Sequence, residues 1–247
     1  MPVVTTLNDP VSHEALDDAV AWSTTLLQTA RTSPQRLSEV ARALGGLDAS
    51  SLPLDGEARG AFWVNVYNAL MLHAVRAFDL RAGSRVPLGV FGRASYRVGG
   101  AAFSLHVIEH GLLRRNRPAP YTFWSPLRAG DARRGAMVAR FDPRVHFALN
   151  CAAASCPPIR AYTAAGFDRE LELATRAYVA QECSVDARRG EVRLPYLCGL
   201  YERDFGDAAA ALRWLRPYLD EEVTRWVDAH PSARVGFNTY RWDVVRE

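Results

Sequence analysis

The stretch EARGAFWVNVYNALMLHAVRAF, from Glu57 to Phe78, decides the fold of this 247-residue chain. Its apolar residues follow the spacing of an α-helix, and they cover nearly all of its sides. A helix without a polar face is buried, so we expect this one to lie at the centre of the protein with several neighbours around it. With 49% hydrophobic residues, the chain is large enough to form one sizeable core around such a helix.

Shorter patterns predict the elements around this central helix. Further helices are expected over residues 13–30, 34–44, 105–115 and 167–181, followed by three short helical patterns. Glycines between short alternating runs predict hairpins at Gly99-Gly100 and at Arg189-Gly190, and a last strand is expected over 234–238. The βαβ rhythm of a doubly wound sheet is absent. We therefore expect an α+β fold, helix-rich around a small, mostly antiparallel sheet, as in papain-like or transglutaminase-like folds.

The same patterns predict the domain organisation. Residues 1–50 are expected to form N-terminal helices packed on the core, and residues 51–247 a single α+β domain that carries the chemistry-bearing motifs. No internal repeat and no low-complexity linker separates further domains.

A second stretch, RVHFALNCAAASCPPIR from Arg144 to Arg160, is the best place to look for an active site. Apolar residues alternate over 145–150, which predicts a buried strand, and the double proline ends it. Cys151 would then stand at the end of that strand, where a scaffold commonly presents reactive groups. The alternative is that Cys151 and Cys156 are small buried hydrophobic residues.

Polar side chains inside apolar segments are the other candidates, because a buried amide or imidazole needs a partner. Asn65 and Asn68 lie three residues apart on the central helix, where they either lock packing or orient a catalytic group. The helix expected after Ser104 carries Glu109 and His110, with Glu109 closer to the core.

Four ordered motifs resemble one known family: AFWVNVYNALMLHAV, YRVGGAAFSLHVIEHGLLR, DPRVHFALNCAAASCPP and YERDFG. Together they are similar to the domain of unknown function 547, which occurs in bacteria, plants and nematodes and has no established activity. The resemblance covers roughly residues 56–205. It matches the family pattern at seven positions: Asn65, Asn68, Glu109, His110, His146, Cys151 and Cys156. The chain departs from the pattern at His106 and around Cys198, which makes those two residues poor candidates for a shared mechanism.

The leading functional hypothesis is a thiol-dependent enzyme that transfers acyl groups or hydrolyses amides. A nucleophilic thiol needs a nearby imidazole, and the imidazole needs an orienting carboxylate or amide. Cys151 would be the nucleophile, His110 the base, and Glu109, Asn65 or Asn68 the orienting group. His146 is the weaker base for Cys151, since five residues along a strand would separate the two, but it would suit Cys156.

Two other classes of function stay open at this stage. In a non-catalytic interaction or structural domain, the same polar residues would be satisfied core groups. In a zinc-binding domain, His146, Cys151 and Cys156 would be joined by His106 or His110, although the cysteine spacing is looser than in common zinc sites.

Composition and charge exclude several partners. All 30 basic residues are arginines, yet they form no basic stripe, so we expect no nucleic-acid partner. No membrane-spanning run, export signal or nucleotide-binding glycine loop is visible, so we expect a cytoplasmic protein that needs no membrane and no cofactor. We also expect reduced cysteines, with Cys151 and Cys156 not disulfide-bonded. The substrate would be a small molecule or a peptide or acyl compound, and the oligomeric state is open.

Overall fold

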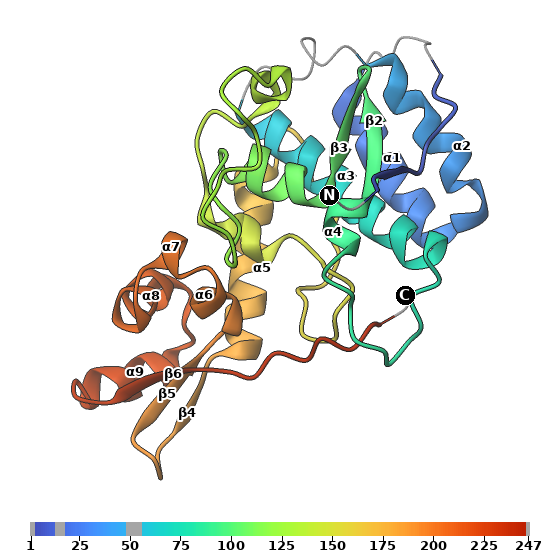
Figure 1. The fold of residues 1–247 in the computed structure, drawn as a ribbon. Coiled ribbons are helices and arrows are strands. Elements are labelled where there is room, and N and C mark those ends of the chain that lie inside the picture. The colour runs from blue at the N-terminus through green and yellow to red at the C-terminus, as the bar shows by residue number, and fades with distance from the viewer. Residues whose placement is uncertain (1–2, 13–17, 48–55, 246–247) are drawn as a thin grey trace.

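Helix α3 (Gly56–Ala77) lies at the centre of the protein, as the sequence predicts (Figure 1). In this computed structural model, residues 3–12, 18–47 and 56–245 are described. Nearly every residue of α3 between Ala58 and Val75 is buried, so all sides of the helix are in contact with neighbours. The protein is a helix-rich α+β domain built around this helix.

The N-terminal helices pack on α3. Helix α1 (Ala19–Thr32) begins after Asp18, whose carboxylate accepts a hydrogen bond from the backbone of Ala21, and it lies against α3. The second predicted helix is a succession of short turns: η1 (Pro34–Arg36), α2 (Leu37–Ala41) and η2 (Arg42–Gly46). Residues 13–17 of the first predicted helix, and the domain boundary expected at residue 50, lie outside the described residues.

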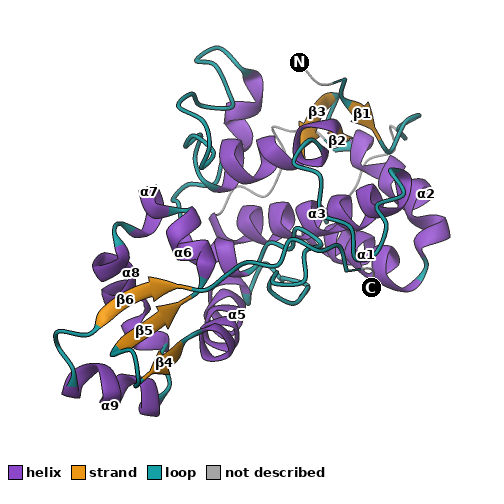
Figure 2. Cartoon of the chain, turned by 60° about the horizontal axis from the view of Figure 1, so that its bottom comes forward, coloured by secondary structure: helices purple, strands orange, loops and turns teal. Residues whose placement is uncertain are grey.

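Two separate three-stranded sheets replace the single sheet that the sequence suggests (Figure 2). The first has the order β1-β2-β3 and consists of β1 (Thr5–Thr6), β2 (Ala94–Val98) and β3 (Ala101–Ser104), with the short helix α4 (Val90–Arg93) before β2. Strands β2 and β3 form the predicted hairpin, whose Gly99 and Gly100 have φ values of 54° and 81° that suit glycine. Strand β1 pairs with β2 in parallel, so this sheet is mixed.

The second sheet lies at the other end of the molecule and has the order β4-β5-β6. Its strands are β4 (Ser184–Asp186), β5 (Glu191–Leu194) and β6 (Arg234–Phe237), of which β4 and β5 form the second predicted hairpin. Helix α5 (Phe167–Glu182) connects the central region to this sheet, and its bounds match the prediction closely. Short helices follow β5: α6 (Tyr196–Leu200), α7 (Glu202–Phe205), α8 (Ala208–Leu215), η6 (Arg216–Tyr218) and α9 (Glu221–Ala229).

The strand predicted over 145–150 is wrong: this segment contains the 3-10 helix η5 (Pro143–Phe147). Asp142 caps η5 by accepting a hydrogen bond from the backbone of Arg144, and Pro143 occupies its first turn. In a half-buried strand only every second residue would be buried, whereas residues 145–149 are all buried. The alternation of apolar residues in the sequence therefore does not mark the two faces of a strand. Cys151 therefore lies in a loop and not at the end of a strand.

Three further segments complete the fold. The helix expected over 105–115 is present, but residues Val107–Leu113 form a π-helix, η3, and η4 (Ala132–Ala136) follows it. After β6, residues 238–245 form an extended C-terminal strap, which runs back across the molecule in red in Figure 1. The strap is held on both sides, because Val86 N donates to Trp242 O and Ala154 N donates to Asp243 O, each over 2.9 Å. In the parts of the chain that the structure describes, no helix is both long enough and apolar enough to span a bilayer.

Candidate functional site

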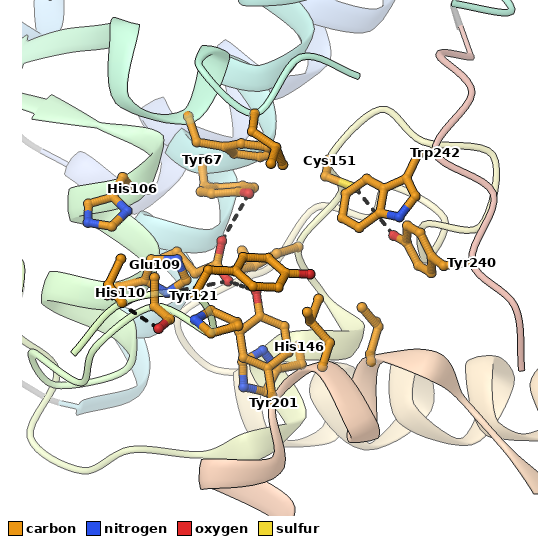
Figure 3. A pocket seen from close by; sticks show the side chains of 18 residues that line it. Tyr67, His106, Glu109, His110, Tyr121, His146, Cys151, Tyr201, Tyr240 and Trp242 are labelled. Carbon is orange, nitrogen blue, oxygen red and sulfur yellow. Dashed lines mark hydrogen bonds and ion pairs between the residues drawn. The ribbon is translucent and has the colours of Figure 1, made fainter. Parts of the chain in front are cut away.

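A pocket of about 200 Å³ lies between η3, the loop after η5, the junction of α6 and α7, and the C-terminal strap (Figure 3). Most of its lining is aliphatic or aromatic. Three histidines and one carboxylate interrupt that lining: His106, His110, His146 and Glu109. An apolar pocket with a few converging polar groups is the usual form of a small-molecule site.

The π-helix η3 brings two consecutive residues, Glu109 and His110, into the pocket lining. Consecutive side chains of an α-helix point about 100° apart, whereas a π turn is wider and is frequently found at functional sites. The backbone N–H of Arg114 donates to Glu109 O over 2.8 Å, five residues back, as expected for this geometry. The prediction of a helix at this position is confirmed, but the helix is a π-helix and not an α-helix.

Glu109 is buried and is held by two tyrosine hydroxyls. Tyr67 OH donates to its Oε2 over 3.1 Å, and Tyr201 OH donates to its Oε1. Burial by itself would raise the pKa of Glu109, but the charged form of His110, the Tyr201 hydrogen bond and Arg114 lower that pKa below its ordinary value. At neutral pH, where His110 is neutral, the two tyrosine hydrogen bonds and the Arg114 charge keep Glu109 ionised.

His110 is neutral in this arrangement and accepts a hydrogen bond through Nδ1. Arg114 Nη1 lies 3.0 Å from His110 Nδ1, and a guanidinium can only donate, so Nδ1 accepts. Burial, opposed by Glu109 and reinforced by Arg114, lowers the pKa of His110 to about 4. The single proton of the neutral ring is then on Nε2.

His146 has the opposite arrangement. Its Nε2 lies 2.9 Å from Asp204 Oδ2, and because a carboxylate only accepts, Nε2 donates. Burial lowers the pKa of His146 despite Asp204, so the ring is neutral and its lone pair is on Nδ1. The ring also stacks on Tyr201, with 3.8 Å between the ring centroids, which fixes its plane.

One buried ion pair connects the two histidines. Arg114 Nε donates to Asp204 Oδ2 over 2.6 Å, while the same guanidinium donates to His110 and the same carboxylate accepts from His146. Burial raises the pKa of Asp204, but the hydrogen bonds from His146 and Arg114 outweigh burial and hold that pKa far below its ordinary value. The pair is thus ionised and sets both imidazole tautomers.

The two cysteines form a disulfide, Cys151–Cys156, which corrects our expectation of two free thiols. Cys151 lies in the pocket wall, and the Tyr240 hydroxyl is 3.3 Å from Cys151 Sγ and 3.1 Å from Cys156 Sγ. The small-residue loop between them turns back sharply, with Ala152 at a φ of 61°, and this brings the two sulfur atoms together. Among the described residues, no imidazole is hydrogen-bonded to either sulfur.

The amino-acid sequence around this site matches a known protein family. A family model described as a protein of unknown function, DUF547, matches residues 52–179, just over half of the chain. The chain belongs to the DUF547 family. No curated protein and no solved structure matches it. The DUF547 match contains Glu109, His110, His146 and Cys151 but ends before Tyr201, Asp204 and the strap, so the pocket is completed by residues beyond the matched region.

The two candidate asparagines of the DUF547 region do not line the pocket. Asn65 donates to Tyr162 O over 2.8 Å and to Ser23 Oγ over 3.1 Å, and it accepts from Tyr162 N. Asn68 donates to Ala148 O over 3.0 Å and accepts from Asn150 N over 2.9 Å. Both side chains fasten loops to α3, as expected if these amides lock packing.

Six residues that the site uses were not among the sequence candidates: Tyr67, Arg114, Tyr201, Asp204, Tyr240 and Trp242. The first four lie within the motifs that carry the family resemblance, as the tyrosine of WVNVYNAL, the first arginine after HGLL, and the tyrosine and aspartate of YERDFG. The sequence signal that could have identified these four residues is a polar side chain inside a family motif. No group of three or more His, Cys, Asp or Glu side chains in residues 3–12, 18–47 and 56–245 is arranged to hold a metal ion, so the zinc alternative has no geometric support.

Proposed function

We propose that the chain is an enzyme that catalyses acyl transfer or hydrolysis on a small molecule by general acid–base catalysis in this pocket. His146 is the base and His110 the hydrogen-bond donor to the developing oxyanion. The reaction class is the one expected from the sequence, but the imidazoles, and not a resting thiol, carry it.

The observation that supports this proposal is the pair of opposite tautomers held by one ion pair. Arg114 and Asp204 leave His110 with a proton on Nε2 and His146 with a lone pair on Nδ1. Two neutral imidazoles in one pocket, one able to donate and one able to accept, are what acid–base catalysis near neutral pH requires. A purely structural core would not need both tautomers to be fixed beside a cavity.

In the proposed reaction, His146 Nδ1 takes a proton from water or another nucleophile as its heteroatom bonds to the acyl carbon. The carbonyl π electrons move to oxygen, where His110 Nε2–H stabilises the negative charge. When the carbonyl re-forms, the bond to the leaving group breaks and His146 gives its proton to the leaving heteroatom. The Glu109 carboxylate stabilises the transient His146 cation electrostatically.

Cys151 provides a second candidate mechanism because it lies in the wall of the same pocket. After a reductant such as a phosphine cleaves the disulfide, the Cys151 thiolate would attack the acyl carbon in place of water, as the sequence-based hypothesis has it. This route requires the reductant, and it requires an imidazole to approach a sulfur atom that now lies beside Tyr240.

The test is hydrolysis and aminolysis of a panel of small p-nitrophenyl esters and anilides, with and without tris(2-carboxyethyl)phosphine. We expect turnover in the oxidised protein and a loss of about 100-fold or more in kcat for His146→Ala, with His230→Ala on the exposed surface as the matched control. Activity that appears only after reduction and disappears in Cys151→Ala would establish the thiol mechanism instead. Absence of turnover in both states would leave the interaction-domain alternative.

A further inference from the structure

Among the described residues that line the pocket, Glu109 is the only ionised side chain. They include no arginine, lysine or aspartate, and their three histidines are neutral because burial lowers their pKa values. Arg114 lies behind the wall, where its charge is paired with Asp204. A ligand inside the pocket therefore meets one negative charge and no positive one.

Aromatic rings make up much of the remaining wall: Tyr67, Phe91, Tyr121, Tyr201, Tyr240 and Trp242. In the view of Figure 3, Glu109 is on one side with Tyr67 and Tyr201, and Tyr240 and Trp242 are on the other side. Tyr240 and Trp242 lie next to each other, with 4.7 Å between their ring centroids. Aromatic faces attract cations through their quadrupoles, and they do so more strongly where water is excluded.

We infer that this pocket binds an organic cation, a primary or quaternary amine on a small apolar body, with its charge toward Glu109 and its body against Tyr240 and Trp242. An anionic ligand would face the Glu109 carboxylate without a compensating charge in the lining. A neutral ligand would use the apolar walls but leave the Glu109 charge, which is hydrogen-bonded to Tyr67 and Tyr201, without an opposite charge in the pocket. A cation satisfies both features.

The size of the pocket limits the ligand. A dry cavity of about 150 Å³ accommodates benzene, so a pocket of about 200 Å³ suits a single ring or short chain with an ammonium group. The place of this cation in the chemistry rests on the proposed function: an amine is the leaving group of amide hydrolysis and the acceptor of acyl transfer. Its binding can be measured without any turnover.

The test compares ligands that share one body and differ in charge. Binding of 2-phenylethylammonium, 2-phenylethanol and phenylacetate to the oxidised 247-residue protein is measured by calorimetry at low and moderate salt. We expect the ammonium ligand to bind about tenfold or more tightly than the alcohol, and phenylacetate to bind weakest. Benzyltrimethylammonium, which cannot donate a strong hydrogen bond, should also bind more tightly than the alcohol. Equal affinity for the ammonium ligand and the alcohol, or tightest binding of phenylacetate, overturns the inference.

Two variants locate the site. Glu109→Gln should remove the preference for the ammonium ligand, and Trp242→Leu, which keeps an apolar side chain on the strap, should weaken both cations more than the alcohol. If Glu109→Gln does not fold, the wild-type series and Trp242→Leu still decide. If cations bind preferentially but no His146-dependent turnover is found, the cation site is supported and the proposed reaction is wrong. If His146-dependent turnover is found but cations are not preferred, the proposed reaction is supported and the cation site is wrong.

Discussion

Arg114 and Asp204 form an ion pair that is buried on both sides: their side chains are 1% and 0% exposed, and Arg114 Nε lies 2.6 Å from Asp204 Oδ2. They are 90 residues apart in the chain. The pair joins the segment that the family model matches to the α6–α7 region beyond it. Its geometry therefore determines both how the two parts of the domain meet and how the two pocket histidines are protonated.

Breaking this pair should be costly. Asp204→Asn leaves the buried Arg114 charge without its partner, and we expect the free energy of unfolding to fall by about 3–5 kcal/mol in urea denaturation. Asp131→Asn is the control, because its pair with Arg133 is partly exposed and should be worth about 1 kcal/mol or less. The double variant Arg114→Met, Asp204→Leu should be less destabilised than Asp204→Asn. A cost for Asp204→Asn no larger than that of the control would contradict this account.

The buried neutral histidine predicts a pH dependence of stability. Burial holds the pKa of His110 at about 4 in the folded protein, against an ordinary value of 6.5 in the unfolded chain. Between these pH values the unfolded chain binds a proton that the folded protein does not, so stability falls as the pH falls from 6.5 to 4. Over this pH range, protonation of His110 in the unfolded chain lowers the free energy of unfolding by up to about 3 kcal/mol.

The measurement is urea denaturation of wild type and His110→Gln at several pH values between 7 and 4. Burial also lowers the pKa of His73 to about 4, so His73 acts in the same direction. The free energy of unfolding of His110→Gln should therefore still fall as the pH falls, but with a slope smaller by the contribution of one bound proton. His230→Gln, at an exposed position, should leave the slope unchanged. Identical slopes for wild type and His110→Gln would show that His110 is not buried in its neutral form.

The elements predicted correctly are those whose signal is local. The central helix, the two glycine hairpins and helix α5 each depend on a periodicity or a turn within one segment. The failures depend on distant partners. Strand β1 has two residues and exists only because it pairs with β2. The segment of η5 was predicted as a strand from its alternating apolar residues, but distant segments bury all of residues 145–149, so the alternation does not report a strand.

The site follows the same division. Glu109, His110, His146 and Cys151 were candidates from chemistry and local pattern, and all four line one pocket. Their partners from distant segments could not be predicted: Asp204 of α7 fixes the tautomer of His146, and Tyr240 of the strap contacts the sulfur of Cys151. No local pattern indicates that YERDFG packs beside η5, because that contact is made by the fold as a whole. The disulfide was missed for a related reason, since the expectation of free thiols depended on the absence of an export signal and not on loop geometry.

The disulfide predicts the order in which the four cysteines react. In the oxidised protein, iodoacetamide should label none of them, because Cys183 and Cys198 are buried and burial raises the pKa of Cys183 to about 12. After mild reduction, Cys151 in the pocket wall should be labelled well before Cys183 and Cys198, as measured by peptide mass mapping. Labelling of Cys151 without reductant would show that the disulfide is absent.

Asn68 tests whether the α3 amides are structural. Its side chain bonds both Ala148 O and Asn150 N, and replacement by alanine leaves these two backbone groups without their partner. We expect Asn68→Ala to lower the free energy of unfolding by about 2–3 kcal/mol, while Thr25→Ala on the exposed face of α1 changes it by about 0.5 kcal/mol or less. Because Asn68 does not line the pocket, cation binding and kcat of the folded variant, measured well below its Tm, should stay within about threefold of wild type. A loss of about 100-fold in kcat with little change in stability would place Asn68 in the chemistry after all.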